Sequence, residues 1–85
     1  MALSRAELKK AVGHLAARDW PAAHEIVQRD EESALSCWAH GIVHIMEGDI
    51  PNARYWYGQA KRAFPAKPDA ARETESLAAQ IAALK

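Results

Sequence analysis

The sequence predicts an all-α fold of about five helices, and three observations support this prediction. The chain is 49% hydrophobic, with alanine dominant and only four glycines and four prolines. Alanine favours helix because it loses no side-chain entropy there. Apolar residues recur at the spacing of one helix face in several segments. Ser4, Asp19 and Asp49 precede such segments, and residues of these types commonly cap helices.

Length and charge limit the kinds of protein this chain can be. A chain of 85 residues has room for one domain, residues 1–85. Lys+Arg and Asp+Glu are equal at 11 each, so the net charge is zero. A general nucleic-acid binder needs a basic surplus, and we therefore expect no nucleic-acid partner. Near-neutral charge gives little repulsion between copies, which favours self-association.

Cysteine usage and hydropathy predict the compartment. One cysteine cannot form an internal disulfide, which is typical of a reducing environment. The N-terminal MALSRAELKK has no apolar run of signal-peptide length, and no window approaches the roughly 20 apolar residues of a membrane span. We therefore expect a cytoplasmic protein without membrane association.

A first helical hairpin is predicted over about residues 4–30. Its first helix, residues 5 to about 17, begins at the S-x-x-E capping box that starts at Ser4. Asp19 caps the second helix, which ends near Arg29. A proline in the first turn of that helix costs no hydrogen bond, because its position lacks an intrahelical acceptor.

A second hairpin is predicted over about residues 34–65. Its first helix, about residues 34–47, is apolar almost all round, so we expect it to lie between neighbouring helices. Gly48 is a natural helix stop. Asp49 caps the following helix, predicted over residues 51–64.

The remaining segments are a turn, a break and a last helix. The acidic run Asp30–Glu32 is interpreted as a solvated turn. Pro65 to Pro68 interrupts the helices, since proline disfavours helix in the residue before it. A final helix over about residues 69–84 has a narrow apolar seam, which suits a helix that caps the last open apolar face. The predicted architecture is thus two stacked antiparallel hairpins and a C-terminal capping helix.

An internal repeat supports the stacked hairpins. At an offset of 30 residues, Asp19-Trp20-Pro21-Ala22-Ala23 matches Asp49-Ile50-Pro51-Asn52-Ala53. Both segments follow an Asp-apolar-Pro-x-Ala pattern. Two helix-turn-helix units with one plan are typical of stacked helical repeats.

The second hairpin also resembles a known repeat family. Small residues, a Gly-Asp pair, an aromatic residue and a proline follow at fixed steps in Gly41, Gly48-Asp49, Ala53, Tyr57, Ala60 and Pro65. In this spacing, the segment from about residue 34 to 67 resembles a tetratricopeptide repeat. The resemblance implies a helical-hairpin fold that hosts partners of many kinds. The run W-x-H-x-x-x-H-x-x-E-G-D-x-x-N-A-x-Y-W-Y-x-x-A is also similar to that of small, functionally uncharacterised proteins, which implies a shared compact helical domain.

One polar stripe on the predicted third helix is the best candidate for a site. Cys37, His40, His44 and Glu47 are spaced so that they share one side of that helix. Two histidines at i and i+4 can share a metal ion. Stacked hairpins would bring side chains of the second and fourth helices toward this stripe. The candidate ligand-binding residues are His24, Gln28, His40, His44, Glu47, Asn52 and Tyr55.

The stripe admits three interpretations. The first is a structural hydrogen-bond network between helices, because most buried polar groups are simply satisfied. The second is a site for a small molecule or organic anion, and the third is a metal site. No cofactor, metal-ligand set or catalytic residue is predicted.

These interpretations give three functional hypotheses. A protein-interaction or scaffold module, with a protein partner or a homodimer, ranks first. A protein that binds a small ligand or metal in a histidine-rich pocket between the second, third and fourth helices ranks second. A small enzyme with a His/Glu proton-transfer site ranks third, because no nucleophile with a positioned base is visible.

Overall fold

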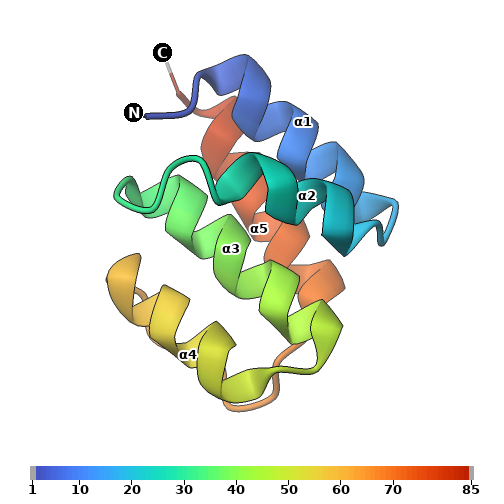
Figure 1. The fold of residues 1–85 in the computed structure, drawn as a ribbon, viewed down its shortest axis with the longest axis vertical. Helices are drawn as coiled ribbons and strands as arrows, with labels where there is room; N and C mark the ends of the chain where they lie inside the picture. Colours follow the sequence, from blue (N-terminus) through green and yellow to red (C-terminus); the bar gives the residue numbers. More distant parts are fainter. Residues whose placement is uncertain (1, 85) are drawn as a thin grey trace.

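A computed structural model describes residues 2–84, and its described residues form five helices (Figure 1). The helices are α1 (Arg5–Ala16), α2 (Trp20–Val27), α3 (Ala34–Glu47), α4 (Ile50–Gln59) and α5 (Ala70–Ala82). The all-α class with about five helices is confirmed. Among these helices, none has the length and apolar character that crossing a bilayer requires.

Helix α3 lies at the centre of the fold. It contacts each of the other four helices, and Figure 1 shows it flanked by α2 on one side and α4 on the other. All nine residues from Ser36 to His44 are buried. The prediction that this helix is sandwiched between neighbours is therefore confirmed. The largest fully buried side chains are Trp38, Tyr57, Leu15, Ile42, Leu77 and Ile81.

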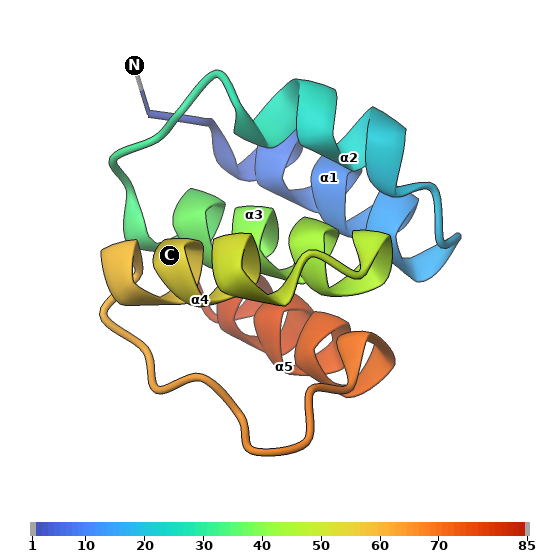
Figure 2. The ribbon, with the colours of Figure 1, turned by 60° about the horizontal axis from the view of Figure 1, so that its bottom comes forward.

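Helix α5 packs against α1 and α3, and Figure 2 shows it on the side of α3 opposite α2. The long connection after α4 carries the chain back to this position. Polar contacts fix α5 there: Glu73 Oε1 accepts hydrogen bonds from Trp38 Nε1 at 3.2 Å and from Tyr57 Oη at 2.6 Å. A single carboxylate thus joins α3, α4 and α5.

Helix α4 is shorter than predicted. The sequence predicts it to Phe64, whereas the structure ends it at Gln59. Lys61 adopts a left-handed backbone with φ of 58°. Around it, Lys61 N–H donates to Gly58 O and Arg62 N–H to Tyr57 O at 3.1 and 3.0 Å, which is the Schellman arrangement that closes helices. The stop was missed because this position is usually glycine and here is lysine.

The other helix ends lie close to their predicted positions. The capping box at Ser4 and the Asp19 and Asp49 caps are all present. Gly48 ends α3 with φ of 88°, as predicted. The remaining differences are one or two residues at a terminus, within the usual fraying of helix ends.

Asp30 is not the solvated turn residue that the sequence predicts. It is 2% exposed, and its carboxylate accepts backbone hydrogen bonds from Leu3, Glu32 and Ser33 as well as one from the Ser33 hydroxyl. Burial alone would raise its pKa, but these four donors lower the pKa to about 2. The carboxylate therefore holds the N-terminal segment against the α2–α3 turn.

We predict that Asp30→Asn lowers the free energy of unfolding by about 2 kcal/mol at pH 7. The depressed pKa means that the carboxylate stabilises the fold above its unfolded pKa near 3.8, and that this stability is lost as the pH falls toward 2. Urea unfolding between pH 2 and 7 measures the effect. Glu31→Gln is the control, because Glu31 is the exposed neighbour of Asp30. Equal losses of unfolding free energy in the two variants would contradict the prediction.

Candidate functional site

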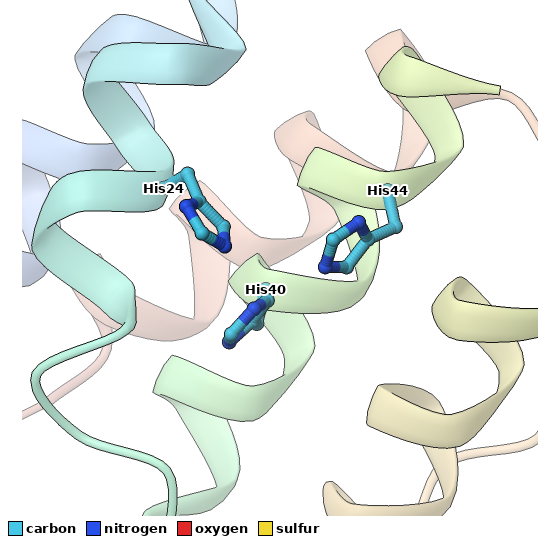
Figure 3. A group of neighbouring side chains, drawn as sticks. All are labelled: His24, His40 and His44. Atoms are coloured by element: carbon cyan, nitrogen blue, oxygen red, sulfur yellow. The ribbon is translucent and has the colours of Figure 1, made fainter. Parts of the chain in front are cut away.

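Three of the four histidines come together between α2 and α3. His24 lies on α2, and His40 and His44 lie one turn apart on α3, with all three rings facing one another (Figure 3). The ring centroid of His24 lies 5.0 Å from that of His40 and 5.6 Å from that of His44. The centroids of His40 and His44 are 5.0 Å apart. We call these three residues the histidine cluster. One nitrogen from each ring lies within 4.8 Å of the other two.

His40 is the most buried member of the cluster, at 3% exposure. Its ring stacks on Trp56 of α4, with centroids 3.9 Å apart and planes at 9°. Its Nδ1 is buried and has no hydrogen-bond partner among the described residues. Burial, reinforced by the neighbouring charges of His44 and His24, lowers the pKa of His40 to about 3. The ring is therefore neutral at pH 7.

His44 is held in one orientation from both sides. Its Nδ1 lies 2.8 Å from Glu47 Oε1, and its Nε2 lies 3.3 Å from Asn52 Nδ2. A carboxylate accepts only, so Nδ1 carries the proton and Nε2 offers its lone pair to the Asn52 amide. This arrangement fixes the tautomer that presents a basic nitrogen toward the cluster.

The structure brings together five of the seven predicted site residues. His24, His40, His44, Glu47 and Asn52 form one connected group. Tyr55 is 56% exposed and lies outside this group; its ring meets the Trp56 ring edge-on, with centroids 5.0 Å apart. Gln28 is exposed at the end of α2 and lines a separate surface hollow with residues of α1.

Trp56 belongs to the site, although it is not among the seven residues that the sequence predicts for it. It is buried in the interior, and its face also forms the wall on which His40 stacks. The i, i+4 spacing of Asn52 and Trp56 on α4 places both side chains toward α3. That spacing is the signal that would have found it.

Cys37 does not join the histidine cluster. Although it lies on the same helix three residues before His40, it is fully buried, and the histidine cluster forms without it. Burial, together with the charges of Asp30 and Glu31, raises the pKa of its thiol. It is therefore a neutral core residue at pH 7 rather than a thiolate.

Comparisons add no known relative. The chain matches no protein-family model, no curated protein and no solved structure. The arguments about function therefore rest on the geometry of the site.

Proposed function

We propose that the protein binds a small ligand at the histidine cluster. The observation that carries this proposal is the buried, unpartnered Nδ1 of His40 beside two further imidazoles. A buried polar atom without a partner costs about 1–3 kcal/mol, in domains whose total stability is about 5–15 kcal/mol. A ligand that bonds this group removes the cost.

The protonation state of the cluster limits the ligand's chemistry. His40 is neutral because its pKa is lowered to about 3, and His44 presents the lone pair of Nε2. Neutral imidazole nitrogens of this kind accept a hydrogen bond or donate an electron pair. A hydrogen-bond donor or a Lewis acid fits these nitrogens, whereas an organic anion would meet no positive charge from His40.

Other features of the surface give less support to an interaction module. The large hydrophobic side chains exposed on the described residues are Tyr55, on α4, and Leu84, after the end of α5. Protein interfaces are built around a desolvated core with aromatic or aliphatic anchors. The protein-interaction module and the homodimer therefore stay predictions from the sequence.

A thermal-shift panel tests ligand binding directly. We would screen the purified protein against zinc, nickel and magnesium chlorides, primary amines, phosphate and acetate. A ligand at 100 times its Kd adds about 2.7 kcal/mol, which raises the Tm of a domain of this size by roughly 10–20 °C. We expect a Lewis acid or a hydrogen-bond donor to raise the Tm, and phosphate and acetate to leave the Tm unchanged.

Two histidine variants show whether a shift comes from the cluster. His40→Leu removes the unpartnered nitrogen and should abolish the shift. His14→Leu is the matched control, because His14 lies on α1 and lines a different surface hollow. The proposal fails when no compound raises the Tm, or when His40→Leu responds as strongly as the parent protein.

A further inference from the structure

The ligand of the proposed site has a definable chemical class, and this inference rests on the proposed function. We infer that the histidine cluster binds one divalent transition-metal ion, with His24, His40 and His44 as its protein ligands. Three side chains that each offer a nitrogen, drawn from two helices, make a site that no single helix face provides.

The spacing of the nitrogens fits an ion after a small adjustment. One nitrogen of each ring lies within 4.8 Å of the other two. Nitrogen ligands around tetrahedral zinc, at about 2.0–2.1 Å from the ion, lie roughly 3.4 Å from one another. Rotation of side chains about their χ angles supplies the difference, because each ring sits at the end of two rotatable bonds. His40 and His44 already project from the same face of α3.

The donor set selects the kind of metal. Neutral imidazole suits zinc, copper, nickel and iron, whereas magnesium and calcium prefer carboxylate, carbonyl and water oxygens. The three ligands leave a fourth tetrahedral position for water or another small ligand.

Glu47 supports the site without serving as a ligand, whereas Asn52 competes with the ion for His44. Glu47 accepts the Nδ1 proton of His44 at 2.8 Å, the carboxylate–histidine arrangement that orients metal-binding imidazoles and raises their basicity. Asn52 Nδ2 lies 3.3 Å from His44 Nε2 and uses the lone pair that a metal ion would need. We expect metal binding to displace this amide.

The need for space also favours an ion over an organic molecule. Four surface hollows, with volumes between 140 and 610 Å³, lie between other parts of the helices. None of these four is lined by a residue of the histidine cluster. An ion takes its place among the side chains and requires no preformed hollow of molecular size.

A second group of potential ligands shares His44 and must be distinguished from the cluster. His44, Glu47 and Asp49 also have ligand atoms within 4.8 Å of one another. Both carboxylates are exposed, and each already accepts a hydrogen bond. Glu47 accepts one from His44. Asp49 caps α4 by accepting one from the Asn52 N–H at 3.3 Å. Unlike the histidine cluster, this group has no buried unpartnered atom.

Isothermal titration of the metal-free protein with zinc, nickel and magnesium chlorides tests the inference. We expect one zinc or nickel ion per chain and no magnesium. His24→Gln should weaken zinc binding by more than about 100-fold, since the loss of a residue that only hydrogen-bonds a metal ligand already costs about 10–100-fold. His24 is half-buried on α2, so we expect this variant to fold, and circular dichroism checks it. His14→Gln, the matched control, should leave the affinity unchanged.

Glu47→Gln separates the two possible ligand groups. Its amide oxygen still accepts the His44 proton, so we expect the variant to retain zinc with an affinity reduced by at most about 100-fold. Complete loss of zinc in this variant would place the ion between His44, Glu47 and Asp49 and overturn the inference.

Three other results would also overturn the inference: no zinc or nickel binding, unchanged affinity in His24→Gln, or one ion shared by two chains. Binding of a primary amine without any metal would overturn the metal inference and leave the proposed function standing. Binding of nothing would overturn both.

Discussion

Gly41→Ala is expected to lower the free energy of unfolding by roughly 3 kcal/mol, although alanine favours helix over glycine by up to about 1 kcal/mol. A Cβ at this position would lie 2.4 and 2.6 Å from two atoms of the Tyr57 ring and 3.3 Å from the Ala53 carbonyl oxygen. The Tyr57 ring is 1% exposed and its hydroxyl donates to Glu73. The ring therefore cannot move aside without loss of that hydrogen bond.

Gly58→Ala is the matched control for this prediction. Gly58 is also a helical glycine, and a Cβ there meets nothing within 4 Å. We expect it to leave stability unchanged or to raise it by up to about 1 kcal/mol. Urea unfolding of both variants measures the difference. Equal stabilities would show that α3 and α4 do not approach each other as closely as the structure has them.

The position of Gly41 illustrates what the sequence could predict. The repeat-like pattern in the second hairpin singled out Gly41 as a small position and Tyr57 as an aromatic one, and the structure adds that these two residues lie against each other. Helix starts were also predictable, because Ser4, Asp19 and Asp49 act on backbone groups three residues away. In such caps, the capping residue and the backbone group that it bonds lie within one helical turn of each other, so the sequence alone shows both. The likeness to tetratricopeptide repeats itself stays a prediction.

The features that the sequence missed are ones that the residue type does not signal. Asp30 resembled a surface acid because the residue type does not show that its carboxylate is buried, and one of its four donors, the Leu3 N–H, lies 27 residues away. Lys61 adopts a left-handed backbone that lysine rarely prefers. Neither residue type signals its role, since the environment that sets that role forms only when the chain folds.

The candidate site was partly predictable for the same reason. Helical spacing alone placed His40, His44 and Glu47 on one stripe, and stacking of hairpins correctly brought His24 and Asn52 to it. Gln28, four residues after His24, ends α2 and turns toward α1 instead. The missing hydrogen-bond partner of His40 Nδ1, on which the functional argument depends, is visible only in three dimensions.

His40→Leu gives the sharpest contrast between a structural and a functional histidine. A structural histidine would lose hydrogen bonds on replacement, and the protein would become less stable. Here Nδ1 has no partner, so we expect the metal-free variant to gain about 1–3 kcal/mol at pH 7, less a smaller loss from the stacking contact with Trp56.

The gain from His40→Leu should increase as the pH falls. Because the pKa of His40 is lowered from 6.5 to about 3 in the folded protein, the unfolded chain binds the proton more readily below pH 6.5. The parent protein then loses up to about 1.4 kcal/mol per pH unit until pH 3, and the leucine variant avoids this loss. His24 and His44 face the same ring and remain in both proteins.

Urea unfolding at pH 5 and pH 7, with a chelator present, measures both effects. His14→Leu again serves as the control, because that histidine lies outside the cluster. A leucine variant less stable than the parent at pH 7 would make His40 a structural residue and remove the main support for a ligand site. Greater stability joined to loss of ligand binding would show that this fold retains a costly histidine for the ligand it binds.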